Sequence, residues 1–107
     1  MVSHVKHESP VRVIVIDVLK PYAPSILDLG KAICDHSSAD SANISVYAND
    51  EKTESVKITI EGKSINFEAV KKIIEKHGAV IHSLDKVILG SKHVIEVPMI
   101  DQPRVEQ

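Results

Sequence analysis

Two stretches decide the fold: Val11–Lys20 reads VRVIVIDVLK, and Val56–Glu61 reads VKITIE. The second alternates strictly between apolar and polar residues, which is the pattern of a strand with one buried face. The first, up to Leu19, is apolar on both faces. Val and Ile dominate both stretches, and β-branched side chains pack well on a pleated surface. Both stretches are therefore predicted to be strands.

Each of these strands leads into a predicted helix. Ser25 is placed to cap a first helix of about 11 residues, whose buried stripe has helical spacing. That stripe consists of Ile26, Leu29, Gly30, Ile33 and Cys34. Asn66 caps a second helix, and Gly78 is placed to end it in the left-handed conformation. Its stripe consists of Phe67, Val70, Ile73, Ile74 and His77.

Two further strands complete the pattern. Residues 44–48 alternate between the apolar residues Ile44, Val46 and Ala48 and the intervening Ser45 and Tyr47, which predicts a strand before the turn Asn49–Lys52. A fourth strand is predicted from Ala79 to Ile88. Lys20–Pro24 is expected to break the first strand, and Asp35–Asn43 to form a polar loop. The order βαββαβ repeats strand–helix–strand twice. It predicts an α+β ferredoxin-like sandwich, with a four-stranded antiparallel sheet in the order 4-1-3-2 and both helices on one face.

The chain divides into three predicted segments. Residues 1–10 are polar and end at Pro10, so we expect a flexible arm. Residues 11–90 form the ferredoxin-like domain, and residues 91–107 form a C-terminal tail. Within the tail, Val94–Ile100 is a candidate fifth strand, which Pro98 restricts to a sheet edge.

Composition excludes several classes of protein. Thirteen basic against fifteen acidic residues give a net charge of −2, so bulk charge does not hold the chain on nucleic acid or on an anionic membrane. The longest apolar run, Val13–Ile16, is far shorter than the roughly 20 residues of a membrane helix. One cysteine, Cys34, cannot form an internal disulfide and is expected to be a small core residue. We therefore expect a cytoplasmic protein.

The face of the sheet opposite the helices is predicted to bind a second copy of the chain. The register places Val13 and Val15 on that open face, where Tyr47 on a neighbouring strand would extend the apolar patch. Val94 and Val97 of the tail are expected to support the contact by pairing with a neighbour's exposed edge. The predicted partner is thus the same chain, as a homo-oligomer.

Four polar residues form a candidate ligand site. Asp17 and Glu61 are equivalent in the repeat, and we expect them on adjacent parallel strands at the same end of the sheet. His82 starts the antiparallel fourth strand at that end, and a bulge at residues 83–85 would turn Asp85 toward it. Together they predict a site for a divalent cation, calcium or magnesium, or for a small-molecule ligand. Alternatively, the carboxylates are solvated or pair with basic residues, namely Arg12, Lys57 or Lys86.

Three segments together resemble a known family. They are Ile16–Pro21, Val56–Gly62 and Ala79–Val87, which read IDVLKP, VKITIEG and AVIHSLDKV. In this order they resemble the archaeal family known as domain of unknown function two hundred and eleven, over about residues 11–92. The resemblance implies a ferredoxin-like fold, an archaeal cytoplasmic protein and a ring-like or other multimeric assembly. It implies no activity, and therefore no catalytic residues.

Two functions follow from these observations. The first is a non-enzymatic module that assembles with itself or binds a ligand or divalent cation. The second is a small enzyme that uses the carboxylate–histidine cluster for metal-assisted hydrolysis. A soft-metal carrier would need Cys-x-x-Cys after the first strand, where the chain has Lys20–Pro24. RNA binding on the sheet would need aromatic side chains where Val13, Val15, Lys57 and Thr59 stand.

Overall fold

A computed structural model describes residues 9–92 and Val94 of the chain. Within them the order is βαββαβ, as predicted. The strands are β1 (Val11–Pro21), β2 (Ser41–Asn49), β3 (Thr53–Glu61) and β4 (Val80–Leu89). The helices are α1 (Ile26–His36) and α2 (Phe67–Lys76). The predicted helices are confirmed, whereas β1, β2 and β3 are longer than predicted. The predicted polar loop Asp35–Asn43 is correspondingly shorter, because α1 continues to His36 and β2 begins at Ser41.

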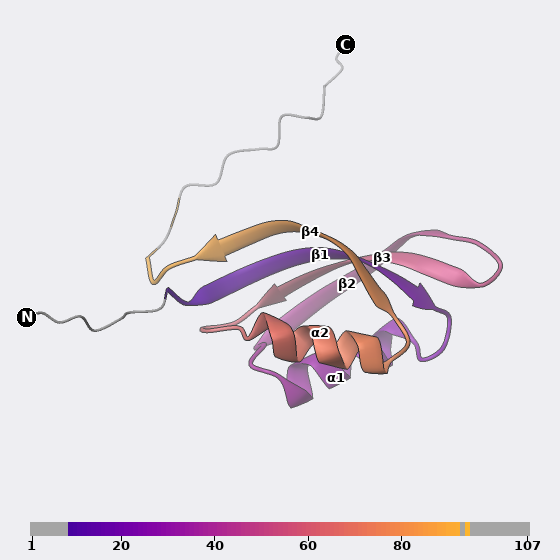
Figure 1. The fold of residues 1–107 in the computed structure, drawn as a ribbon, viewed down its shortest axis with the longest axis horizontal. Coiled ribbons are helices and arrows are strands. Elements are labelled where there is room, and N and C mark those ends of the chain that lie inside the picture. Colours follow the sequence, from indigo (N-terminus) through magenta and orange to yellow (C-terminus); the bar gives the residue numbers. More distant parts are fainter. Residues whose placement is uncertain (1–8, 93, 95–107) are drawn as a thin grey trace, which may run out of the picture.

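The described residues form a four-stranded sheet in the order β2-β3-β1-β4, which is the predicted order read from the other edge. All of its pairs are antiparallel. Figure 1 shows both helices against one face of the sheet, and no described helix covers the opposite face. The fold is therefore α+β and ferredoxin-like.

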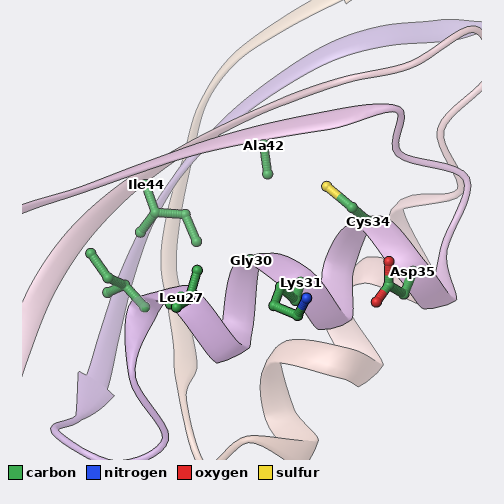
Figure 2. A pocket seen from close by; sticks show the side chains of 8 residues that line it. Leu27, Gly30, Lys31, Cys34, Asp35, Ala42 and Ile44 are labelled. Carbon is green, nitrogen blue, oxygen red and sulfur yellow. The ribbon is translucent and has the colours of Figure 1, made fainter.

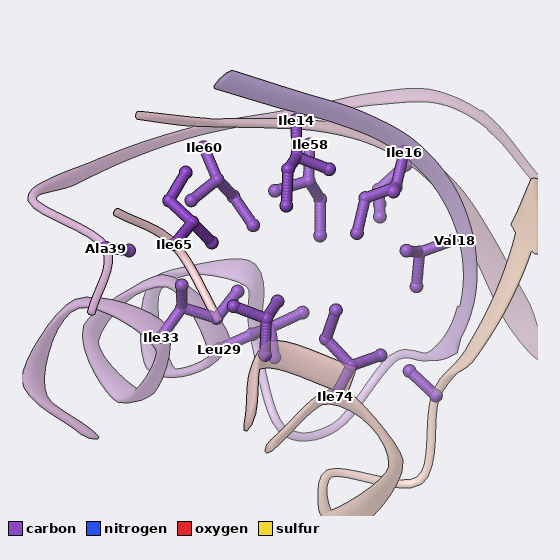
Figure 3. Close-up of a cluster of buried hydrophobic side chains, with 13 residues drawn as sticks. Ile14, Ile16, Val18, Leu29, Ile33, Ala39, Ile58, Ile60, Ile65 and Ile74 are labelled. Atoms are coloured by element: carbon purple, nitrogen blue, oxygen red, sulfur yellow. The ribbon is translucent and has the colours of Figure 1, made fainter. Parts of the chain in front are cut away.

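The core lies between the sheet and the two helices. It is built from alternate residues of β1 and β3, from the inner stripes of the helices and from three side chains of the connecting segments (Figure 3). Its members are Ile14, Ile16, Val18, Leu29, Ile33, Ala39, Val56, Ile58, Ile60, Ile65, Val70, Ile74 and Ala79. The predicted register of the central strands is therefore confirmed.

The helix ends follow the sequence signals. The Ser25 side chain accepts a hydrogen bond from the amide of Asp28, and the Asn66 side chain accepts one from the amide of Ala69. These bonds satisfy amides that have no partner within the helix. Gly78 follows α2 with a φ of 78°, a conformation that glycine adopts without strain. Neither described helix is long and apolar enough to cross a membrane.

Two predicted segments cannot be compared with the structure. Residues 1–8 of the N-terminal arm lie outside the described residues. The same holds for most of the predicted fifth strand, Val94–Ile100, including Val97. Val94 is described, and it is exposed and belongs to no helix or strand.

Candidate functional site

The open face of the sheet is organised by the alternation of β1. Ile14, Ile16 and Val18 are buried against the helices, so the intervening side chains of Val13, Val15 and Asp17 lie on the open face. Residues paired across antiparallel strands share a face, which places their β3 partners there too. Those partners are Glu61, Thr59 and Lys57. The prediction that Val13, Val15 and Asp17 lie on this face is confirmed.

A row of polar side chains crosses the open face over all four strands. The Tyr47 hydroxyl on β2 donates to the Asp17 carboxylate on β1, with an O–O distance of 2.5 Å. The Lys57 ammonium on β3 donates to the Asp85 carboxylate on β4 at 2.6 Å. The Ser83 hydroxyl donates to the same carboxylate at 2.8 Å. These bonds satisfy both carboxylates and fix their side chains over the middle of the sheet.

Asp85 reaches this row because of a bulge. Val15 pairs with Lys86 and Ile16 pairs with Leu84, so Asp85 is the extra residue between them. An extra residue changes the direction of the side chains around it. The bulge predicted at residues 83–85 is therefore present, and it turns Asp85 toward Lys57.

The polar row changes the proton affinity of three of its members. Because the Tyr47 hydroxyl donates to Asp17, whose negative charge opposes a second one, the pKa of Tyr47 is raised. Hydrogen bonds from Lys57 and then Ser83 lower the pKa of the Asp85 carboxyl. The bond to Asp85 correspondingly raises the pKa of Lys57. All three groups are largely solvent-accessible, so the row consists of surface interactions.

A small hollow of about 200 Å³ lies beside this row. The polar residues of its lining are Asp17, Tyr47, Ser55 and His82. Leu19 and Val18 form the rest of the lining. His82 and Asp17 thus lie at the same end of the sheet, as predicted.

The predicted neighbourhood of Asp17 and Glu61 is wrong. Strand β3 runs antiparallel to β1, so Asp17 stands opposite Lys57 whereas Glu61 stands opposite Val13. The two carboxylates are therefore four residues apart along the sheet, or about 13 Å. Glu61 instead lines a separate surface hollow with Arg12 and Asp40. Across the described part of the chain, no three His, Cys, Asp or Glu side chains group together as a metal site.

One buried cation was missed by the sequence reasoning. Lys20 is 2% exposed at the end of β1 and does not belong to the predicted break. Its ammonium donates to the carbonyl oxygens of Pro21 and Tyr22, at 2.7 and 3.2 Å, and to the Glu54 carboxylate at 3.0 Å. Lys20 continues the inward alternation of Ile16 and Val18, which is the signal that would have found it.

An apolar groove of about 440 Å³ runs between α1 and the outer strand β2 (Figure 2). Gly30 lies at its floor, where a Cβ atom would be 3.3 Å from Cδ1 of Ile44. Figure 2 shows the Cys34 thiol directed across the groove toward β2, near Ala42. Cys34 is therefore half-buried in a groove wall, which differs from the predicted core position. The remaining lining residues are Ile26, Leu27, Lys31 and Asp35.

Comparison with known proteins places this chain among archaeal relatives. The family model described as "Uncharacterized ArCR", DUF211, matches residues 12–104. The "Uncharacterized protein MJ0319" of Methanocaldococcus jannaschii is 45% identical over 87 residues, which cover 81% of this chain and 90% of that protein. The predicted family resemblance is confirmed. With its βαββαβ order of strands and helices and this match over most of its length, the chain belongs to the DUF211 family.

Proposed function

We propose that this protein is a non-enzymatic module that associates with further copies of itself through the open face of its sheet. The observation that carries the proposal is the outward row of β1. Val13 and Val15 are half-buried there, and Leu19 is exposed on the same side. Val13 pairs with Ile88 of β4, which extends the apolar surface across the strands. Apolar side chains grouped on one face in this way are typical of subunit interfaces.

The polar row supports the same function. Charged groups buried at an interface weaken it unless each is paired and hydrogen-bonded. Here Lys57 pairs with Asp85, and Asp17 accepts from Tyr47, all within one chain. A second copy can therefore cover Lys57 and Asp85 as an ion pair, while the Asp17 carboxylate keeps the hydrogen bond from Tyr47. Tyr47, which is 56% exposed, adds an aromatic ring of the kind enriched in interface centres.

The hollow at Asp17 favours a second function, the binding of a small polar molecule. A hollow of about 200 Å³ whose lining residues include Asp17, Tyr47, Ser55 and His82 suits a ligand that carries hydrogen-bond donors, such as an amine. A thermal-shift screen of small amines and polyols tests this function. Stabilisation that Asp17→Asn removes and Glu61→Gln retains would support it, and an unchanged melting temperature throughout would contradict it. The calcium or magnesium site and the metal-assisted hydrolase remain predictions from sequence, as does the cytoplasmic location.

Self-association is tested with a double variant, Val13→Lys/Val15→Glu. Each new charge faces a residue of the other sign on the neighbouring strand, because Val13 pairs with Glu61 and Val15 pairs with Lys86. The single chain should therefore tolerate both, with no change in net charge. We expect multi-angle light scattering to give a lower mass for this variant than for the wild type.

The matched control is Leu84→Lys/Val87→Glu. Both residues are exposed, yet they pair with Ile16 and Ile14 and therefore lie on the helix side of the sheet. The control should keep the wild-type mass. Equal masses for the wild type and the open-face variant, with both chains folded by circular dichroism, would overturn the proposal.

A further inference from the structure

The two edges of the sheet differ in how well they are protected against pairing. On β4, the register with β1 shifts at three places, and the strand carries Asp85 and Lys86. Bulges and charges are the features that keep an exposed edge from adding another strand. By contrast, β2 reads SANISVYAN with no charged residue. Its register with β3 is regular from Ser41 to Val46 and shifts once, before Ala48.

The apolar groove lies on the same edge as this unprotected strand. Ala42 and Ile44 of β2 form one wall, and α1 forms the other. Leu27, on the α1 side, is 69% exposed. A strand added beside β2 would extend the sheet past this groove, and the helix that accompanies the strand would cover Leu27. Edge and groove therefore form one continuous surface.

The charges on α1 indicate which partner fits. Lys31 and Asp35 are exposed one turn apart on the groove side of the helix. Among the ion pairs of the described residues, none joins these two side chains. Lysine on the N-terminal side of an acidic residue is the weaker order for a pair within a helix. Two such helices side by side and antiparallel would bring each Lys31 to the Asp35 of the other copy.

We propose that a second copy of this chain docks by antiparallel pairing of β2 with β2. The two sheets become one continuous sheet, and the two α1 helices close the groove over Leu27. Lys31 of each copy pairs with Asp35 of the other, so the contact is self-complementary about a two-fold axis. This inference rests on the proposed self-association and adds a second contact surface to it. The open-face variant changes side chains of β1 and the edge variants change side chains of α1, so each contact can be tested alone.

The test uses Lys31→Glu and Asp35→Lys in the background of the open-face variant Val13→Lys/Val15→Glu. In that background only the edge contact remains, and we expect a mass of twice 11.7 kDa by light scattering. Lys31→Glu leaves two acidic residues, at positions 31 and 35, on the groove side of α1, and Asp35→Lys leaves two basic ones. Each should therefore give a single-chain mass alone, and an equimolar mixture should regain the double mass. Lys72→Glu, an exposed charge reversal on α2, is the control and should leave the double mass unchanged.

Three results would overturn this inference. The first is a single-chain mass for the open-face variant itself. The second is a double mass when Lys31→Glu is added to it and measured without Asp35→Lys, and the third is a single-chain mass for the equimolar mixture. If instead the open-face variant keeps the full wild-type mass while Lys31→Glu lowers it, the proposed function fails and the edge contact stands.

Cys34 provides a second readout, because it is the single cysteine of the chain and lines the groove. In the paired state its reaction with a disulfide reagent should be slower by about tenfold or more than in Lys31→Glu, since covered thiols react slowly. Diluting the paired protein should raise the rate toward that of the variant. A rate that is equal in both proteins at every concentration would contradict closure of the groove.

Discussion

The hydroxyl of Tyr47 reaches over strand β3 to donate to the carboxylate of Asp17 on β1. The Lys57 ammonium lies 5.9 Å from the centre of the Tyr47 ring, and Lys57 stands directly opposite Asp17. Three residues on three neighbouring strands, Tyr47, Lys57 and Asp17, therefore lie next to one another on the open face. This arrangement holds Tyr47 over the open face, where the proposed interface requires it.

The pKa of Tyr47 gives the first prediction. In Tyr22→Phe, Tyr47 is the one remaining tyrosine of the chain, and its ultraviolet titration should have a midpoint above about 10, the ordinary value. Because the folded state holds the Tyr47 proton more tightly than the unfolded state, the hydrogen bond stabilises the fold below about pH 10. This stabilisation is lost as the pH rises through the raised pKa of Tyr47. Adding Asp17→Asn should lower the midpoint. A midpoint that does not respond to Asp17 would contradict the hydrogen bond.

The Lys57–Asp85 pair gives the second prediction. The pKa of Asp85 is lowered and that of Lys57 is raised. The pair therefore contributes to the stability of the fold between about pH 4 and pH 10, the ordinary pKa values of the two groups. Asp85→Asn should reduce the unfolding free energy by no more than about 1 kcal/mol at pH 7, because the pair is exposed. In urea unfolding this difference should disappear as the pH falls through the lowered pKa of Asp85. Glu51→Gln, in the exposed β2–β3 turn, is the control, and an Asp85→Asn effect that persists undiminished at pH 2 would refute the account.

The core gives the third prediction. Ile58 is fully buried opposite Ile16, so Ile58→Ala should cost about 2–5 kcal/mol of unfolding free energy. Thr59, the next residue, lies on the open face, and Thr59→Ala should cost less than about 1 kcal/mol. Urea unfolding at one fixed protein concentration measures both. Similar costs for the two variants would mean that the faces of β3 are wrongly assigned.

Gly62 gives the fourth prediction. A Cβ atom there would lie 2.7 Å from the Ser38 carbonyl oxygen and 3.0 Å from Cγ1 of Ile65. Gly62→Ala should therefore destabilise the protein by about 1–3 kcal/mol. The comparison is Gly30→Ala, where the nearest atom is the flexible end of Ile44 at 3.3 Å and the helix gains about 1 kcal/mol from alanine. Gly30→Ala should be neutral or stabilising, and an equal loss in both would contradict this account.

Much of the fold could be read from the sequence because local signals agreed with each other. The alternation of Val56–Glu61 assigned the faces of β3 correctly, and Ser25 and Asn66 marked where the helices begin. Lys20 was equally readable from the inward alternation of β1. It was missed because a charged residue before Pro21 also fits a strand end. Its burial is favourable because the Glu54 carboxylate on β3 and the carbonyl oxygens of Pro21 and Tyr22 accept its hydrogen bonds.

The candidate site was less predictable, because it depends on strand direction and register. The crossover through α1 makes β2 parallel to β1, and the β2–β3 turn then makes β3 antiparallel to both, which separates Asp17 from Glu61. The predicted antiparallel sheet already excludes parallel β1 and β3, so the expected closeness of Asp17 and Glu61 conflicted with the predicted fold. Tyr47 and Asp17 meet across an intervening strand, and Cys34 lines a groove because α1 leaves part of β2 uncovered. Both depend on how elements pack, which sequence spacing does not encode.

The central claim is that this chain assembles with itself. The mass of the wild-type protein in solution, measured by size exclusion with multi-angle light scattering over a range of concentrations, tests it most directly. The account predicts a multiple of the chain mass of 11.7 kDa that Val13→Lys/Val15→Glu lowers. A mass of 11.7 kDa at every concentration would contradict it.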